Sequence, residues 1–320
     1  MFNIDIGAKK DVINYDEVYD FIALGLGPGG LNAGLYAGRK GLKTLVVGHD
    51  FGGQLKNTSE VDNYLGVGLV DATKLISMFK THLETLEIPL LTNVIVTKIE
   101  KKANNLFHVT LNNDKVLQAK TLLYAFGGNP RKLEVPGEHL LAGRGISYCV
   151  TCDGPFYKGQ DVIVAGGGNS AVDAAKDLAR IAKSVTIIQR STLRADQKSV
   201  DSLLKLPNVK VMLQTQIKGF IGDDKMEGVE IIDKRTGKVS VINAAAAFIE
   251  IGNIPNTALL QGLVDLNDAG EVYVNSRQET SLAGLYAAGD ITSDSHRQII
   301  IAAGDGAKAA LEAANYINNQ

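Results

Sequence analysis

Residues 21–30 read FIALGLGPGG, an apolar run that ends in a glycine-rich turn. The residues that follow, 31–39, have a helical pattern, and 43–47 form a second apolar run. A strand, a tight glycine turn, a helix and a second strand in this order make a βαβ unit. The stretch therefore predicts a doubly wound α/β sheet.

The same order recurs further along the chain. Residues 161–171 read DVIVAGGGNSA, a helix is expected to about Ala182, and 184–188 form the next strand. Two units of this kind predict an α/β protein with two Rossmann-like dinucleotide-binding domains. The alternative, two glycine turns without a ligand, does not explain why strand and helix flank the turn both times.

Each glycine has a separate task in such a turn. Gly25 permits the tight bend, Gly27 lets the backbone approach a pyrophosphate, and Gly30 lets the helix and the strand pack closely. The N–H groups at the start of the helix then favour the phosphates. The second turn repeats this pattern with Gly166, Gly168 and Ala171.

Two further turn sequences suggest how the domains are connected. The chain reads GGNP at 127–130 and GNIP at 252–255, and we expect it to cross between domains there. The closing helix, 299–317, is too short to be a domain alone. We therefore expect residues 132–254 to be inserted into a discontinuous domain made of 1–131 and 255–320. A helix is also expected at 71–86, and strands at 94–100, 106–111, 116–119, 122–126, 209–214, 226–233, 239–251 and 285–288.

Composition limits the classes of partner. Lysine and arginine number 33 against 35 aspartate and glutamate, so no basic excess attracts nucleic acid or an anionic membrane. The apolar runs are much shorter than a membrane span. The first 19 residues lack the basic start and apolar stretch of a signal peptide. We expect a cytoplasmic protein that binds neither nucleic acid nor membrane.

The chain has only two cysteines, Cys149 and Cys152. On a helical turn they would face the same side, close enough for a reducible disulfide, and a helix N-terminus would stabilise a thiolate. Asp153 is placed to exchange protons with a neighbouring thiol. A lone CxxC also suits half of a zinc site or two core cysteines. No histidine clusters near the pair, so we expect no metal site, and the two dinucleotide turns favour redox chemistry.

The residues after the second strand of each unit bear on the choice of nucleotide. In the first unit Asp50 could accept hydrogen bonds from a ribose. In the second unit no carboxylate follows the strand, and Arg190 and Arg194 would suit a 2′-phosphate, which favours NADPH over NADH. The alternative is that both arginines belong to a solvated surface.

Together these motifs resemble the low-molecular-weight thioredoxin reductases over nearly the whole chain. The resemblance is specific because many motifs occur in the same order. They are the turn at 25–30, GGQL at 52–55, EVDNY at 60–64, PGE at 136–138, CVTCDG at 149–154, the turn at 166–171, IGNIPNT at 251–257, AAGD at 287–290 and Arg297-Gln298.

The resemblance implies a cofactor and a set of roles. FAD would be resident in the discontinuous domain, with its pyrophosphate at the first glycine turn, and the inserted domain would resemble an NAD(P)H-binding domain that carries the CxxC pair. Cys152 would be the cysteine next to the flavin, Cys149 would attack the partner, and Asp153 would be the acid and base. The remaining FAD contacts would be Gln54 and Asn63 beside the flavin, Asp290 at the ribityl–phosphate region, and Arg297 and Gln298 at the isoalloxazine.

The resemblance also implies partners. Members reduce a thioredoxin-like protein, form homodimers, and rotate the inserted domain so that the cysteines meet flavin and partner in turn. Relatives that reduce peroxiredoxins carry an extra N-terminal domain, which we do not expect in a chain of 320 residues.

One departure concerns the electron donor. NADPH-using members carry His-Arg-Arg and then Arg where this chain reads QRSTLR at 189–194, and Asn169 replaces the usual Asp. The donor therefore stays open among NADPH, NADH, ferredoxin and a deazaflavin. A catalytically silent flavin-binding sensor is the alternative from another class, and it has little need for Cys149, Cys152 and Asp153.

Overall fold

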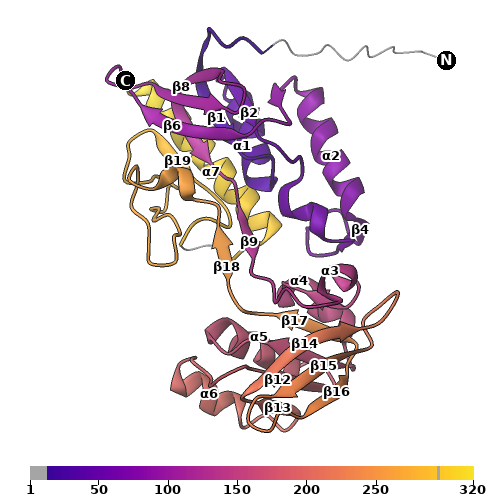
Figure 1. The fold of residues 1–320 in the computed structure, drawn as a ribbon. Coiled ribbons are helices and arrows are strands. Elements are labelled where there is room, and N and C mark those ends of the chain that lie inside the picture. The colour runs from indigo at the N-terminus through magenta and orange to yellow at the C-terminus, as the bar shows by residue number, and fades with distance from the viewer. Residues whose placement is uncertain (1–12, 294–295) are drawn as a thin grey trace, which may run out of the picture. The chain divides into compact units, whose positions relative to one another are not determined.

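The computed structural model of the chain describes residues 13–293 and 296–320. The prediction that there is no signal peptide concerned residues 1–19, and 1–12 lie outside the described residues. The described residues form two compact units (Figure 1), one made of those up to 56, of 70–128 and of those from 255 on, the other of 57–69 and 129–254. The chain passes between the units after residues 56 and 69, and again within β9 (Gly128–Pro130) and β18 (Asn253–Pro255), two strands that pair with each other.

The first unit is built on a seven-stranded sheet. Its strands are β1 (Val18–Leu24), β2 (Thr44–Val47), β5 (Leu90–Leu91), β6 (Val96–Lys101), β7 (Phe107–Leu111), β8 (Val116–Tyr124) and β19 (Leu285–Ala287). The order is β5-β2-β1-β8-β7-β6, with β19 also beside β8. Strands β1, β2, β5, β8 and β19 are parallel, and β6 and β7 add an antiparallel meander. The buried parallel strands have apolar side chains on both faces, as layers above and below a sheet require.

Helices α1 (Pro28–Arg39) and α7 (Ile299–Asn318) pack on this sheet, and α2 (Ala72–Thr85) packs beside α1 (Figure 1). Helices α1 and α7 pack closely because small residues meet between them. A Cβ atom added to Gly306 would lie 2.0 Å from the carbonyl oxygen of Gly29. Asn32 ties the same two helices by donating to the carbonyl of Ala303 at 2.6 Å.

The second unit contains a five-stranded parallel sheet in the order β10-β17-β11-β12-β13. An antiparallel sheet β14-β15-β16 belongs to the same unit. The strands are β10 (Ile146–Ser147), β11 (Asp161–Ala165), β12 (Ser184–Ile188), β13 (Val209–Met212), β14 (Thr215–Ile221), β15 (Gly228–Asp233), β16 (Val239–Asn243) and β17 (Ala246–Ile249). The helices are α3 (Glu138–Leu141), α4 (Val150–Asp153), α5 (Asn169–Ala179) and α6 (Gln197–Leu203). Short elements complete the chain: β3 (Glu60–Val61), β4 (Val70–Asp71) and the 3₁₀ turns Gly53–Asn57, Gly154–Tyr157 and Ala258–Leu260.

The predicted fold class is confirmed, since each unit contains the βαβ order around its glycine turn. The structure differs from the prediction in several details. The strands expected at 116–119 and 122–126 are one strand, β8. The strand expected at 239–251 is two, because β16 pairs with β15 while β17 enters the parallel sheet beside β11. Strand β14 was missed, since a bulge between Ile217 and Gly219 breaks its alternation.

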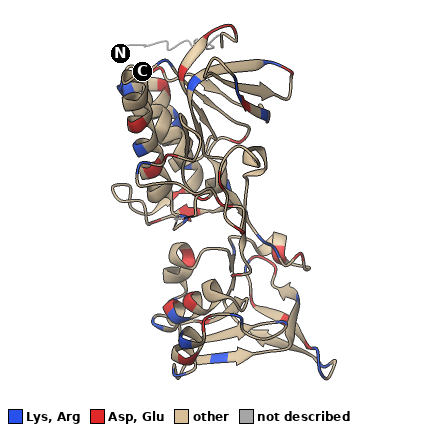
Figure 2. Ribbon diagram, turned by 90° about the vertical axis from the view of Figure 1, so that its left-hand side faces the viewer, with Lys and Arg blue, Asp and Glu red and all other residues tan. Residues whose placement is uncertain are grey.

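Lys and Arg residues alternate with Asp and Glu residues along the ribbon in Figure 2. Among the described residues, no helix is both long enough and apolar enough to cross a bilayer.

Candidate active site

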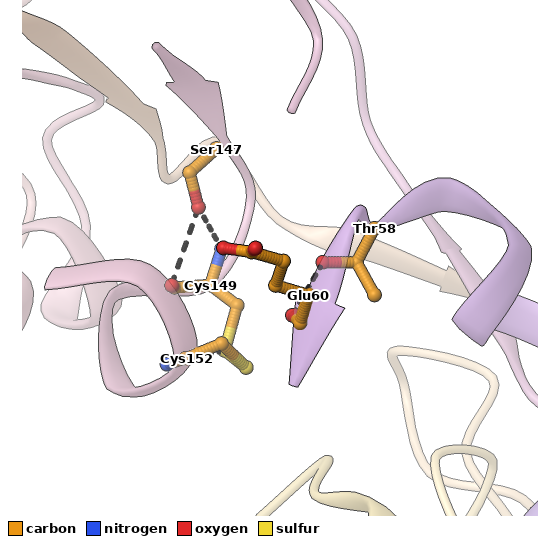
Figure 3. The surroundings of a disulfide bond; sticks show 5 residues. All are labelled: Thr58, Glu60, Ser147, Cys149 and Cys152. Atoms are coloured by element: carbon orange, nitrogen blue, oxygen red, sulfur yellow. Dashed lines mark hydrogen bonds between the residues drawn. A yellow bond between two sulfur atoms is a disulfide. The ribbon is translucent and has the colours of Figure 1, made fainter. Parts of the chain in front are cut away.

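The two cysteines form a disulfide at the start of α4 (Figure 3). Their Cα atoms are 5.3 Å apart, and Cys149 is the N-cap residue of the helix. The backbone N–H of Cys152 donates to Cys149 Sγ at 3.2 Å. The predicted disulfide is therefore confirmed, and Cys149 Sγ accepts a backbone hydrogen bond.

Ser147 fixes the backbone of Cys149. Its buried hydroxyl lies beside both polar groups of that residue, accepting from the N–H at 3.0 Å and donating to the carbonyl at 3.2 Å (Figure 3). Ser147 ends β10, so the cysteine turn is attached directly to the parallel sheet. Sequence reasoning missed this residue, because a single serine before a cysteine has no distinctive pattern.

Asp153 follows the disulfide and is half-buried. Burial raises the pKa of its carboxyl group, a hydrogen bond from Ser147 opposes that rise, and the nearby Asp62 carboxylate adds to it. Burial is the largest of these effects, so the pKa is higher than that of an ordinary aspartate. A carboxyl group with a raised pKa keeps its proton closer to neutral pH, which suits a proton donor.

A buried carboxylate holds the residue before Cys149. Glu138 is 3% exposed and accepts hydrogen bonds from the backbone N–H groups of Leu133 at 3.0 Å and Glu134 at 2.6 Å. It also accepts from the hydroxyl of Tyr148 at 3.0 Å. Burial, followed by this contact with Glu138, raises the pKa of Tyr148. Glu138 lies in the PGE motif noted above, although the motif gave no indication of this role.

The first glycine turn joins β1 to α1 and has the shape of a phosphate cradle. Gly25 has a φ of 126°, and a Cβ atom there would lie 2.2 Å from the carbonyl oxygen of Ala125. A Cβ atom on Gly30 would lie 1.9 Å from the carbonyl oxygen of Gly25. At Gly27 the nearest heavy atom is 3.9 Å away, so a side chain would fill space that a pyrophosphate needs. The three glycines fit the dinucleotide predicted for them.

Other predicted FAD contacts in the first unit have polar partners. Gln54 donates to the carbonyl of Gly128 at 2.7 Å. Arg297 has a φ of 47° and forms an ion pair with Glu271 at 2.9 Å, and Gln298 is the N-cap residue of α7. Sequence reasoning did not identify Glu271.

Asp290 and Arg297 lie close enough to influence each other. Burial raises the pKa of Asp290, the positive charge of Arg297 opposes this, and Asp305 reinforces it. Asn63 lies in the 57–69 segment of the second unit, whereas Gln54 and Asp290 belong to the first.

Asp50 follows β2 and is engaged by neighbouring side chains. It forms an ion pair with Lys56 at 2.7 Å and a hydrogen bond with His49 Nδ1 at 3.0 Å, and these contacts lower its pKa. The carboxylate is exposed, so it stays available as an acceptor.

The second glycine turn joins β11 to α5. Gly166 has a φ of 146°, and a Cβ atom there would lie 2.2 Å from the carbonyl oxygen of Glu250 and 2.9 Å from Cβ of Ala171. No heavy atom lies within 4 Å of the Cβ position of Gly168. The turn is closed on its inner side and open at Gly168, where a pyrophosphate would lie.

The two predicted arginines follow β12 next to this turn. The backbone N–H of Arg194 donates to the carbonyl of Gly167 at 2.6 Å. Both guanidinium groups belong to exposed residues, and neither Arg190 nor Arg194 takes part in an ion pair with any residue that the structure describes. Gln189, between the strand and Arg190, is buried.

Comparison with known proteins gives this arrangement a family. A model of the pyridine nucleotide-disulphide oxidoreductases matches residues 19–306. The chain belongs to this family. Members of the pyridine nucleotide-disulphide oxidoreductases are flavoproteins, so FAD and a pyridine nucleotide are the cofactors that membership supports.

Three relatives are informative. Thioredoxin reductase from Streptococcus pyogenes has a structure with a TM-score of 0.90 and 34% identity, covering 95% of this chain and 99% of that one. A Staphylococcus epidermidis protein named as a component of alkyl hydroperoxide reductase is 39% identical over 98% of this chain and 62% of its own length. A Bacillus subtilis protein named NADH dehydrogenase is 39% identical over 94% and 59%. The chain thus spans about three fifths of these last two relatives.

Proposed function

We propose that the chain is an FAD-dependent disulfide reductase that passes electrons through Cys149 and Cys152 to a thioredoxin-like protein. The observation that carries this proposal is the disulfide at the start of α4, in a unit that also contains an open dinucleotide turn. The likeness to the Streptococcus pyogenes thioredoxin reductase supports it. When bound, FAD would supply an electron pair to the disulfide.

The two sulfurs then have different tasks. Once the disulfide is reduced, the Cys149 thiolate attacks one sulfur of the partner's disulfide, forming a mixed disulfide and releasing the other partner sulfur as a thiolate. The N–H of Cys152 stabilises the attacking thiolate at 3.2 Å. Cys152 next attacks the mixed disulfide, which restores the Cys149–Cys152 bond and frees the second partner sulfur. Asp153 donates protons to the departing thiolates, because its raised pKa keeps the acid form available.

The cofactor contacts divide between two domains. We place FAD in the domain made of 1–131 and 255–320, with Gly25, Gly27 and Gly30 at its pyrophosphate. The flavin and ribityl contacts are assigned to Gln54, Asn63, Asp290, Arg297 and Gln298. The pyridine nucleotide belongs to the domain 132–254, at Gly166, Gly168 and Ala171.

We propose NADPH as the donor, because Arg190 and Arg194 offer two guanidinium groups beside the second turn and residues 189–194, which follow β12, include no carboxylate. The relative named NADH dehydrogenase makes NADH the principal alternative. Rapid mixing of the FAD-loaded protein with NADPH, NADH or reduced ferredoxin separates the donors. Fast bleaching of the flavin absorbance by NADPH at low concentration supports the proposal, and faster bleaching by another donor contradicts it.

The direct test is turnover of a thioredoxin. The FAD-loaded protein, NADPH and an oxidised thioredoxin are mixed, and formation of thioredoxin thiols is followed. We expect many turnovers, which also exclude a silent flavin-binding sensor. Cys149→Ser should abolish thiol formation and keep the bound flavin, whereas Thr151→Ser, at an exposed position of the same turn, should retain activity. Undiminished thioredoxin reduction by Cys149→Ser contradicts the assigned role.

A second candidate follows from the relative named as a component of alkyl hydroperoxide reductase. In this second candidate function, the Cys149–Cys152 pair supplies electrons, through a dithiol protein, to a peroxidase that reduces hydroperoxides. Hydroperoxide-dependent oxidation of the donor that requires both added proteins identifies this route. Efficient reduction of thioredoxin alone favours the first candidate.

We also propose a cytoplasmic homodimer. Both cysteines of the chain are used in a reversible redox pair, which suits a reducing compartment. The dimer is proposed by analogy with thioredoxin reductases, and sedimentation of the FAD-loaded protein tests it.

A further inference from the structure

Glu138 is a buried carboxylate that connects two separate parts of the second unit. Its Oε2 accepts from the N–H of Glu134 at 2.6 Å, and its Oε1 accepts from the N–H of Leu133 and the hydroxyl of Tyr148, both at 3.0 Å. Three donors offset the cost of removing a charged carboxylate from water. One side chain thus joins the loop that follows β9 to the residue before Cys149.

The PGE turn determines where this carboxylate lies. Gly137 has a φ of 83°, and a Cβ atom there would lie 2.5 Å from the carbonyl oxygen of Phe220 in β14. The N–H of Phe220 donates to the carbonyl of Pro136 at 2.9 Å. The turn is therefore attached to the antiparallel sheet through its backbone, and only glycine allows so close an approach. Glu138 projects from a backbone that is itself held in place.

The loop that receives the carboxylate depends on it. Glu134 has a φ of 58°, a left-handed conformation that residues other than glycine rarely adopt. Its N–H makes the hydrogen bond of 2.6 Å to Glu138. The neighbouring side chains of Leu133 and Val135 are half-buried and pack against the core of the unit. The hydrogen bond and this packing together hold the loop, so the loop in turn holds the carboxylate.

Tyr148 transmits this rigidity to the cysteine turn. Its ring packs against the same core as Leu133, and its hydroxyl donates to Glu138, so the side chain is held at both ends. The next residue, Cys149, accepts from the N–H of Cys152 at 3.2 Å through its sulfur. In the oxidised protein the disulfide keeps that sulfur in place. After reduction, the place of the sulfur depends on the backbone that leads into the turn.

We propose that Glu138 is a positioning residue for the attacking cysteine, which acts through the hydroxyl of Tyr148 to keep Cys149 Sγ beside the N–H of Cys152 once the disulfide is reduced. The inference rests on the proposed function, in which Cys149 attacks the partner. A thiolate that retains this donor is stabilised, so a larger fraction of Cys149 is in the nucleophilic form at neutral pH.

The test measures the reactivity of each cysteine separately and needs no electron transfer from a nucleotide. The FAD-loaded full chain is reduced with dithiothreitol, freed of reductant under nitrogen and alkylated with iodoacetamide at a series of pH values. Fragment-ion mass spectrometry then locates the label on Cys149 or Cys152. In the wild type we expect Cys149 to react faster than Cys152.

Tyr148→Phe removes one hydroxyl and leaves the ring. Cys149 should then react at least about threefold more slowly at neutral pH, because its thiolate is less well held against its donor. The pH profile of its alkylation should move to higher pH, and the rates of variant and wild type should converge at alkaline pH, where the thiol is ionised in both. A change in access to the sulfur would slow the reaction at every pH.

Glu138→Gln tests whether the carboxylate acts through that hydroxyl. The glutamine places an NH₂ group where one oxygen accepted, so the N–H of Leu133 or Glu134 would face another donor. Alkylation of Cys149 should be slowed at least as much as in Tyr148→Phe. The double variant Glu138→Gln/Tyr148→Phe should be no slower than Glu138→Gln alone, because both substitutions break the same connection.

Two variants control for charge and for the loss of a hydroxyl. Glu134→Gln makes the same change of charge on an exposed side chain of the same loop. Tyr157→Phe makes the same change in a tyrosine whose ring packs edge-on against Phe248 at 5.9 Å. Both should keep the wild-type profile. Urea denaturation of the oxidised proteins gives the stability of each variant, and Tyr148→Phe carries the test if Glu138→Gln does not fold.

An unchanged Cys149 profile in Tyr148→Phe, slowing that persists at alkaline pH, or additive effects in the double variant overturns the inference. A loss of stability with an unchanged profile would make Glu138 a purely structural residue, and overturns it too. Failure of the wild type to reduce thioredoxin, with the expected alkylation profiles intact, contradicts the proposed function instead.

Discussion

Ser147 and Asp153 show how neighbouring side chains adjust the chemistry of the disulfide. Ser147 accepts a hydrogen bond from the N–H of Cys149, and its one hydroxyl proton is shared between the Cys149 carbonyl and the Asp153 carboxylate. Burial acts in the opposite direction on Asp153 and is the larger effect. The pH range in which Asp153 keeps its proton therefore depends on two opposing effects on its pKa. Burial raises the pKa, and the hydroxyl of Ser147 lowers it.

Ser147→Ala should make the proton-donor form of Asp153 persist to higher pH. The variant loses the hydrogen bond that lowers the pKa, while burial and Asp62 still raise it, so the alkaline limb of the pH–rate profile should move to higher pH. Thiol–disulfide exchange of the reduced protein with thioredoxin, measured across pH, gives the profile. Ser184→Ala is the matched control, because Ser184 donates to Asp161 at 2.6 Å outside the cysteine turn, and it should leave the profile in place. A downward movement in Ser147→Ala contradicts this role.

Asp153 should also make stability depend on pH. Its pKa is raised on folding, so between the ordinary aspartate pKa and the raised value the folded protein binds a proton that the unfolded chain has lost. The free energy of unfolding of the wild type should then fall as pH rises through that window. In Asp153→Asn it should fall less over the same window, because the titrating carboxyl group is gone. Urea denaturation of the oxidised proteins at a series of pH values measures it, and identical slopes for wild type and variant would count against a raised pKa.

At the scale of elements, the packing of α1 against α7 supports the first glycine turn. Helix α1 begins at Pro28, inside the turn, and α7 crosses it where Gly306 meets the backbone of Gly29. A change in this crossing should therefore move the N–H groups that face the FAD pyrophosphate. Stability of the unit and affinity for FAD are expected to vary together.

Gly306→Ala should lower both the stability of the first unit and its affinity for FAD. Its Cβ atom would lie 2.0 Å from the Gly29 carbonyl oxygen, so the helices must separate, at about 1–3 kcal/mol of unfolding free energy. Gly304→Ala, two residues earlier in α7, meets no heavy atom within 4 Å and should be neutral or stabilising by up to about 1 kcal/mol. Urea denaturation and FAD dissociation measured on both variants give the comparison. Equal effects of the two substitutions would show that the crossing does not support the turn.

For the whole molecule, the sequence was sufficient for the fold class because its two glycine turns each lie between a strand and a helix. The disulfide was predicted from the spacing of Cys149 and Cys152, which local helical geometry determines. Glu138, Ser147 and Glu271 were not given roles, since their partners depend on how distant segments pack. The buried position of Gln189 was hidden for the same reason, because its contact with Gly167 exists only in the folded unit.

The account depends on electrons moving between a bound flavin and one disulfide in the same molecule. Anaerobic titration of the FAD-loaded protein with dithionite counts the electrons taken up per chain. Flavin absorbance and thiol content are measured after each addition. We predict uptake of two electron pairs per chain in the wild type, one for the flavin and one for the disulfide, and of a single pair in Cys149→Ser. Uptake of a single pair by the wild type, with no new thiols after the flavin is reduced, would contradict the account.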